Sequence, residues 1–345
     1  MLYVPLLQTK RGEFIGLCNL THSIKKQIKP VFILTKDKCE ARSTGLAKSI
    51  KENWDCYPFY IDLTRIPEFN IQSQNFIDFI FNDFMKNQLD FTPVIDVESP
   101  NPVIVNFVLK YNIQACIRIN TQIYNGGTLK KIDDLITKLS FNDHQVDLLI
   151  DFEADVKSTR QAHSKHIEHY FEPIEKQFGG RVANIIVAGS SLPSELPRAD
   201  YNPYGFEPRT EWLGFHDFTE NLLPMIERPI FADYSIVHPE EQKPMDYVNP
   251  NAKIRYTISD SYMFAVGYQV LTHTDGYGQY HDISAIIVNS PYFVGAHFSW
   301  GDKYLSDCAI RAQGCGNMET WVKVGHNHHI TFVTHQLASL YGISV

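Results

Sequence analysis

The stretch from Asp147 to Glu153 reads DLLIDFE, in which a short apolar run ends at an acidic residue. Such a run is typical of a strand that is buried on both faces of a parallel sheet. Seven more runs of β-branched and aromatic residues each precede a stretch with helical spacing, and several of them end at a charged residue. The eight runs are Tyr3–Leu7, Pro30–Leu34, Tyr57–Asp62, Phe91–Asp96, Ala115–Ile119, Asp147–Asp151, Ala183–Ala188 and Pro229–Asp233.

The alternation of strands and helices predicts an α/β fold, a (β/α)₈ barrel of the TIM type formed by residues 1–240. A doubly wound open sheet is the main alternative, and it usually has a glycine-rich loop after its first strand. Here the first run is followed by Gln8–Glu13, which reads QTKRGE and contains no such motif. In a barrel, the carboxyl ends of all eight strands meet at one mouth, where active sites lie.

The pattern changes beyond the eighth run. Two β-like runs with a short turn between them predict a hairpin, and helical spacing returns after it. The predicted elements are a hairpin of Ile254–Ile258 and Tyr262–Tyr268, a helix Gln279–Asn289, a glycine-rich region Gly295–Gly325 and a closing helix Ile330–Tyr341. We expect residues 241–345 to form a hairpin-helix extension that belongs to the same domain and caps the mouth of the barrel.

Composition narrows the class of protein. The chain has 345 residues, of which 44% are apolar, and this is enough for a continuous core. A formal net charge of −8 argues against a protein whose whole surface binds nucleic acid. The six cysteines are scattered without a C-x-x-C pair, which favours reduced thiols over a zinc ribbon or a disulfide framework. Without a signal-peptide pattern or an apolar run of about 18 residues, we predict a cytoplasmic protein with no membrane partner.

Acidic residues at the strand ends are the predicted catalytic groups: Asp96, Asp151, Glu153 and Asp233. Carboxylates gathered at one mouth repel one another unless they are protonated, paired or bound to a metal. A divalent cation such as Mg²⁺ or Mn²⁺ would polarise a phosphoryl oxygen or activate water. Alternatively, burial would raise the pKa of one carboxyl group until it serves as a general acid. The structural alternative is that these acids cap helices or pair with Arg118.

Three residues near the same strand ends are predicted to hold an anionic ligand. Arg118 supplies a positive charge from the fifth strand, and Lys10 lies just past the first. Ser190 belongs to the turn GSSLP after the seventh strand, and late loops of barrels often bind phosphate through backbone N–H groups. An ordinary tight loop with a helix cap remains the alternative for this turn.

Several motifs resemble the beta family of phage and bacterial proteins. They include FSWGD at Phe298–Asp302, GHNHH at Gly325–His329, PNAKIRYT at Pro250–Thr257, RTEW at Arg209–Trp212 and YVPL at Tyr3–Leu6. The resemblance spans nearly the whole chain. It departs from the family pattern at Asn251–Lys253, where the family commonly has S-A-N, and at His326, where Thr is expected. It implies an association with phages and mobile genetic regions, and that the C-terminal extension and the barrel form one unit.

The motifs of the extension add aromatic and polar groups to the predicted ligand-binding set: Arg255, Tyr256, Trp300, Asp302 and His328. Aromatic rings stack on bases, and arginine binds phosphate through two parallel hydrogen bonds. The alternative for Trp300 is a core residue that anchors the extension. Adjacent His328 and His329 point in different directions, so we expect chain-end capping and one inward histidine rather than a metal site.

Two functions follow from these residues. The first is a hydrolase-type enzyme that binds a phosphate-containing ligand, a nucleotide or a nucleic-acid end, and acts on it with carboxylates, with or without a divalent metal. The second is a non-catalytic protein that sequesters a ligand or contacts a phage or host protein through the same mouth. Fold alone does not choose between them, since barrels host unrelated functions.

Overall fold

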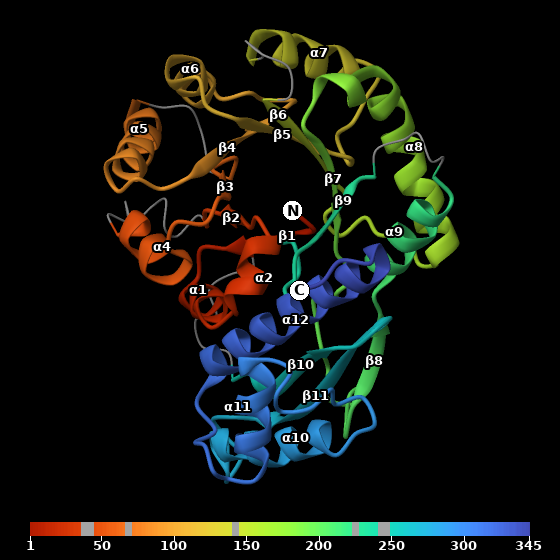
Figure 1. Ribbon diagram of the computed structural model, residues 1–345. Coiled ribbons are helices and arrows are strands. Elements are labelled where there is room, and N and C mark those ends of the chain that lie inside the picture. The colour runs from red at the N-terminus through yellow and green to blue at the C-terminus, as the bar shows by residue number, and fades with distance from the viewer. Residues whose placement is uncertain (36–44, 66–70, 140–144, 223–227, 241–248) are drawn as a thin grey trace. The chain divides into compact units, whose positions relative to one another are not determined.

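The computed structural model describes residues 1–35, 45–65, 71–139, 145–222, 228–240 and 249–345 (Figure 1). The chain divides into two compact units. The barrel unit consists of Met1–Thr9, Ile28–Ser190 and Thr210–Tyr234, and the sheet unit consists of Lys10–Gln27, Ser191–Arg209 and Ser235–Val345. Two segments that precede residue 240 thus belong to the sheet unit. The placement of the extension over the barrel mouth stays a prediction.

Eight parallel strands close into a barrel, which confirms the predicted fold class. Each of the eight predicted runs contributes one strand: β1 (Tyr3–Gln8), β2 (Val31–Ile33), β3 (Phe59–Asp62), β4 (Phe91–Asp96), β5 (Ala115–Asn120), β6 (Val146–Asp151), β7 (Asn184–Gly189) and β9 (Ile230–Asp233). The barrel closes where β9 pairs with β1, with Phe231 opposite Tyr3. The register places Arg118 beside Asp96 on one neighbouring strand, and Asn120 beside Asp151 on the other. The strand ends therefore meet at one mouth.

Helices surround these strands (Figure 1). They are α4 (Leu46–Trp54), α5 (Ile71–Lys86), α6 (Pro102–Tyr111), α7 (Thr128–Leu139), α8 (Arg160–Phe178) and α9 (Thr210–Glu220), with a 3₁₀ turn η1 (Gly179–Arg181). Helix α6 shows how the sequence sets the ends of a helix. The Asn101 side chain accepts a hydrogen bond from the Val103 N–H, Pro102 occupies the first turn, and Asn112 ends the helix in the left-handed conformation.

Phenylalanines join the barrel to its outer layer. Phe59 and Phe91 on β3 and β4 lie against Phe84 of α5, with ring centroids 5.8 and 5.1 Å apart and nearly perpendicular planes. Phe81 of the same helix contacts Phe107 of α6 at 4.6 Å. Edge-to-face pairs of this kind add about 0.5–1.5 kcal/mol each beyond the burial of their area. Helix α5 thus supplies both Phe81 and Phe84 to this aromatic layer.

The sheet unit is built on a three-stranded antiparallel sheet in the order β10-β11-β8. The predicted hairpin is confirmed as β10 (Asn251–Thr257) and β11 (Ser261–Gln269), and β8 (Gly205–Pro208) adds a strand that the sequence did not indicate. On one face, alternate residues of β10 pack in an apolar cluster with Tyr280, Ile283 and Trp321.

Five helices complete this unit: α1 (Arg11–Cys18), α2 (His22–Gln27), α10 (Gln279–Val288), α11 (Trp300–Ala309) and α12 (Met318–Tyr341), with a 3₁₀ turn η2 (Gly276–Gly278). The predicted start of the closing helix at Ile330 is wrong, because α12 begins after a capping box formed by Asn317 and Thr320. The glycine-rich region contains α11, where Gly301 permits close helix packing. A Cβ atom at Gly301 would lie 2.5 Å from the Val324 carbonyl oxygen.

None of the helices in the described part of the chain combines the length and the apolar character needed to cross a bilayer. Five cysteines, Cys18, Cys56, Cys116, Cys308 and Cys315, are free thiols. The sixth, Cys39, lies outside the described residues.

Candidate functional site

Arg118 is the centre of a buried charged cluster at the carboxyl ends of the barrel strands. It lies near the end of β5, between the core residues Ile117 and Ile119, so the alternation of the strand turns its side chain to the opposite face from theirs. Its guanidinium reaches Asp62 on β3 and Tyr234 just after β9, neither of which is on a neighbouring strand. Arg118 therefore spans the interior of the barrel mouth.

Three carboxylates surround this one guanidinium. Nη1 donates to Asp62 Oδ2 at 2.9 Å, Nε donates to Asp151 Oδ2 at 2.9 Å, and Nη2 donates to Glu153 Oε1 at 2.8 Å. The Tyr234 hydroxyl donates to Asp151 Oδ2 at 2.7 Å and accepts a hydrogen bond from Nη2 of Arg118 at 3.2 Å. We call Arg118, Asp62, Asp151, Glu153 and Tyr234 the arginine centre.

The charged groups of the arginine centre shift one another's pKa values. Burial by itself would lower the pKa of Arg118, but the charges of Asp151, Tyr234, Asp62 and Glu153 raise it well above its usual value. Burial and the Asp151 charge likewise raise the pKa of Tyr234. The arginine thus stays charged and the tyrosine stays neutral. Three carboxyl groups share this guanidinium, so the positive charge of Arg118 is divided among them.

Glu153 is the member of the centre that combines a perturbed pKa with access. Burial and the neighbouring Asp151 charge raise its pKa, while Arg118 and Arg65 partly oppose the shift. Its side chain is 25% exposed, whereas those of Asp62 and Asp151 are 1% and 0% exposed. Its backbone is left-handed at φ 50°, and its N–H donates to Asp151 Oδ1 at 2.9 Å. Such strained backbone in non-glycine residues clusters at functional sites.

The other predicted strand-end residues have local partners. Asp96 Oδ1 accepts the backbone N–H groups of Glu98 and Ser99, both at 2.8 Å, so this carboxylate organises its own loop. Asp233 Oδ1 accepts the hydroxyl of Tyr3 at 2.5 Å, which joins β9 to β1. The structure therefore brings Asp151 and Glu153 together around Arg118. Asp96 and Asp233 are instead held by the partners described above.

A backbone hydrogen bond joins Ser190 to Glu153. Its N–H donates to the Glu153 carbonyl oxygen at 2.8 Å, and its residue is buried at the end of the barrel unit. This bond ties the loop after β7 to the loop after β6. The predicted role of Ser190 in binding phosphate stays a prediction.

The predicted residues of the extension, together with Lys10, lie in the sheet unit. Lys10 is exposed and precedes α1. Tyr256, Asp302 and His328 form a buried group in which Asp302 accepts from the Tyr256 hydroxyl at 2.8 Å and lies 2.9 Å from His328 Nδ1. Trp300 opens α11 and packs on Tyr304. His328 lies in the middle of α12, so the expected chain-end position of the histidine cluster is wrong.

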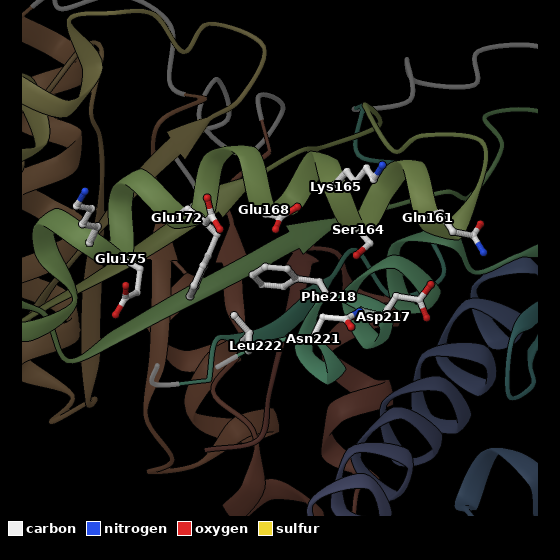
Figure 2. Close-up of a pocket in the computed structure, with 12 residues that line it drawn as sticks. Gln161, Ser164, Lys165, Glu168, Glu172, Glu175, Asp217, Phe218, Asn221 and Leu222 are labelled. Atoms are coloured by element: carbon white, nitrogen blue, oxygen red, sulfur yellow. The ribbon is translucent and has the colours of Figure 1, made fainter. Parts of the chain in front are cut away.

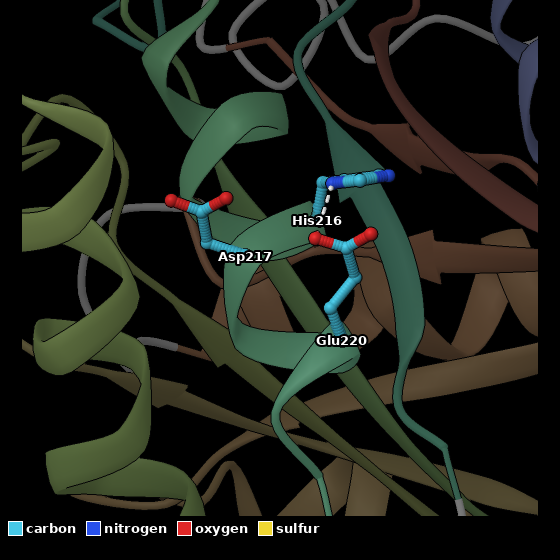
Figure 3. Close-up of side chains that lie close together, drawn as sticks. All are labelled: His216, Asp217 and Glu220. Atoms are coloured by element: carbon cyan, nitrogen blue, oxygen red, sulfur yellow. Dashed lines mark ion pairs between the residues drawn. The ribbon is translucent and has the colours of Figure 1, made fainter.

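Two surface features of the barrel unit are less suited to chemistry. A groove of about 610 Å³ runs between α8 and α9, lined among others by Ser164, Glu168 and Phe218 (Figure 2). His216, Asp217 and Glu220 lie close together on α9, near enough in principle to share a cation (Figure 3). Asp217, however, is already engaged through both oxygens by Arg160, so this group is an ion-pair cluster.

The sequence did not single out Tyr234 of the arginine centre, or Arg65, whose charge acts on the centre. Tyr234 follows Asp233 directly, and position after a strand end was the signal that could have found it. Arg65 comes three residues after Asp62, beyond the end of β3, and its charge acts on Glu153. Asp62 was noted as a strand-end acid but not assigned a role, although its Oδ2 accepts from Arg118.

The protein is therefore a parallel eight-stranded barrel with a buried arginine–carboxylate centre at its mouth. The chain belongs to the beta protein family, which it matches over residues 3–335. No curated protein matches the chain. Among solved structures it is similar to alanine racemase from Clostridium difficile 630 in complex with cycloserine, with 12% identity and a TM-score of 0.35. That similarity covers 74% of this chain and 58% of the racemase chain, less than two thirds of its length.

Proposed function

We propose that this beta family protein is an enzyme in which Glu153 exchanges a proton with a ligand bound at the barrel mouth. The observation that carries the proposal is the contrast within the arginine centre. Glu153 is partly exposed and has a raised pKa, while Asp62 and Asp151 are enclosed and fully engaged by Arg118 and their own neighbours. A carboxyl group with a pKa moved toward neutrality is suited to general acid–base catalysis.

The geometry favours proton transfer over metal catalysis. Asp151 Oδ2 accepts from Arg118 and Tyr234, and Oδ1 accepts from the Glu153 N–H. Both oxygens of this carboxylate are therefore occupied, and a divalent cation would have to displace the Arg118 guanidinium. The Asp96 carboxylate is likewise engaged with its loop. Of the two routes that the sequence left open, the raised pKa of Glu153 supports the acid–base route.

The ligand class that we propose is a phosphate ester, a nucleotide or the end of a nucleic acid. Arg118 would not hold its phosphate, because the guanidinium is already shared among three carboxylates. Arg65 is the better candidate, since its positive charge acts on Glu153 and it is partly exposed. Arg118 and Asp151 would be positioning residues that fix the Glu153 side chain and its proton affinity.

The proposed reaction is hydrolysis. The Glu153 carboxylate takes a proton from water while the water oxygen attacks phosphorus, the ester P–O bond breaks, and the leaving oxygen receives the proton. General acid–base assistance of this kind contributes typically 10²- to 10⁴-fold to the rate. No further reactant is needed for the balance of this step.

The test is a screen of the full chain for hydrolysis of nucleotides and short oligonucleotides, with and without a chelator. We expect turnover that persists in the chelator and falls at least 100-fold in Glu153→Gln. The matched control is Glu98→Gln, a mouth residue whose pKa is lowered and which is paired with Lys131 and Thr128. Equal turnover in Glu153→Gln and the wild type would refute the role of Glu153, and turnover that requires a metal would favour the metal route.

The second candidate is a non-catalytic protein that sequesters a ligand or contacts a phage or host protein. The observation that favours it is the saturation of Arg118, since interlocked ion pairs also stabilise a rigid binding surface. Binding of a nucleotide at the mouth without turnover, unchanged in Glu153→Gln, would support this candidate over the enzyme.

A further inference from the structure

The second face of the sheet in the sheet unit carries an apolar cluster on β11 and two cationic side chains on β10. Ala252, Ile254 and Tyr256 of β10 point into the apolar cluster, so the alternation of the strand turns Lys253 and Arg255 to the opposite face. These two side chains project from positions that are about 7 Å apart along one strand. Both residues are partly exposed.

Arg198 approaches the same face from the segment before β8. Its guanidinium lies 3.8 Å from the ring centroid of Tyr268 on β11, and the His273 ring stacks on Tyr268 at 4.9 Å. Tyr268 alternates with Gly267, whose Cβ position points at Ile283 in the apolar cluster, so Tyr268 points away from that cluster. Lys253 pairs with Val266 and Asn251 pairs with Gln269, so the register shifts between these pairs and Tyr268 lies in the irregular stretch beside Lys253. We call Arg198, Lys253 and Arg255 the basic face.

Within the described residues, these three cations have no carboxylate partner. The Nε atoms of Arg198 and Arg255 are buried without a hydrogen bond. Glu207 lies on the same side of the sheet, opposite Tyr262, but its carboxylate accepts from the hydroxyl of Tyr201 at 2.7 Å. Buried charges are normally paired, because desolvation of an isolated ion is costly.

Burial without a carboxylate partner lowers the pKa of both Lys253 and Arg255. Burial lowers the pKa of Arg255 to about 10. Burial and the positive charge of Arg255 lower the pKa of Lys253 to about 8. An anion placed between the two side chains would reverse both effects, since an opposite charge favours the protonated form.

We propose that the basic face is a binding site for a phosphoryl group, carried either by free phosphate or by a nucleotide. Arg255 offers the planar fork that matches two phosphate oxygens, and Lys253 offers a second charge beside it. The ring of Tyr268 holds Arg198 in place through a cation–π contact rather than offering a free stacking surface. This inference uses only residues of the sheet unit and does not depend on the role of Glu153.

The experiment is isothermal titration calorimetry of the full chain with inorganic phosphate and with a nucleoside monophosphate, at constant ionic strength. We expect binding to the wild type and a loss of affinity of at least tenfold in Arg255→Met and in Lys253→Met. The matched control is Arg311→Met, which removes an exposed arginine of the same unit that pairs with Asp282. Binding of both ligands identifies phosphate itself as sufficient, and binding of the nucleotide alone identifies a larger ligand with the same phosphoryl contact.

Thermal unfolding gives a second readout that does not require the variants to bind. Because Arg255 is desolvated without a partner, Arg255→Met should raise Tm in phosphate-free buffer, whereas phosphate should raise Tm of the wild type only. Equal phosphate affinity in the wild type and both variants, or no binding of either ligand to the wild type, overturns the proposal. Glu153→Gln should keep full phosphate binding at the basic face, which separates this outcome from failure of the proposed barrel chemistry.

Discussion

His328 Nδ1 lies 2.9 Å from Asp302 Oδ2, and His328 Nε2 lies 2.8 Å from the carbonyl oxygen of Thr257. The Asp302 carboxylate and the Thr257 carbonyl oxygen are both acceptors, so the two ring nitrogens of His328 face two acceptor atoms. Burial alone would raise the pKa of Asp302, but the His328 charge and the hydrogen bonds from Ser299 and Tyr256 lower it. The ion pair joins β10, α11 and α12 inside the sheet unit.

The Asp302–His328 pair makes the free energy of unfolding depend on pH. Since the folded pKa of Asp302 is lowered, its contribution is present above the unfolded value of about 3.9 and is lost as pH falls through the folded pKa. We expect Asp302→Asn to destabilise the sheet unit by about 3–5 kcal/mol at pH 7 and to flatten the loss of stability below about pH 4. Urea unfolding at several pH values, followed by tryptophan fluorescence, measures both effects.

The control for this prediction is Asp282→Asn, which removes an exposed carboxylate paired with Arg311. Exposed pairs contribute about 0–1 kcal/mol, so this variant should unfold nearly as the wild type does. If the two variants lost the same stability, the buried Asp302–His328 pair would contribute no more to the free energy of unfolding than an exposed pair does.

The arginine centre predicts that the stability lost in Arg118→Met is partly restored at low pH. Arg118→Met leaves three carboxyl groups at the barrel mouth without their cation, and we expect a loss of about 3–5 kcal/mol at pH 7. Protonation relieves the repulsion, so the loss should shrink as pH falls toward 4. Arg181→Met, which breaks a half-exposed pair with Asp133, serves as the control and should show no such rescue.

The pKa of Glu153 should respond to its neighbour. The Asp151 charge raises this pKa, so Asp151→Asn should lower it. NMR titration of glutamate side chains labelled with ¹³C measures the shift, and Glu153→Gln assigns the resonance by its disappearance. A Glu153 pKa that stayed unchanged in Asp151→Asn would remove the electrostatic basis of the proposed acid–base role.

Close packing of α11 on α12 predicts a steric effect at Gly301. A methyl group there would lie 2.5 Å from the Val324 carbonyl oxygen, so Gly301→Ala must push the two helices apart. We expect a loss of about 1–3 kcal/mol, as in other overpacked sites. Gly314→Ala is the control, because no atom lies within 4 Å of its Cβ position. Equal stability of both variants would contradict the close approach.

The strands of the barrel were predictable because each combines an apolar run with a polar end, a local signal. The partners of Arg118 were not, since Asp62 and Tyr234 are 56 and 116 residues away from it and meet it only when the barrel closes. The start of α12 was misplaced for a different reason. Gly301 and Gly325 suggested a loop, whereas each glycine lies where a helix touches a neighbouring backbone or side chain.

In both units, elements that pair with each other are far apart in the sequence, so they are synthesised at different times. Strand β1 is made long before its partner β9, which is completed only after residue 233 has been added. Helix α1 contacts α12, and the Asn327 side chain that donates to the Gly16 carbonyl oxygen lies 311 positions further along the chain. The ribosome therefore releases early segments long before their partners exist, and we expect slow folding with a high contact order.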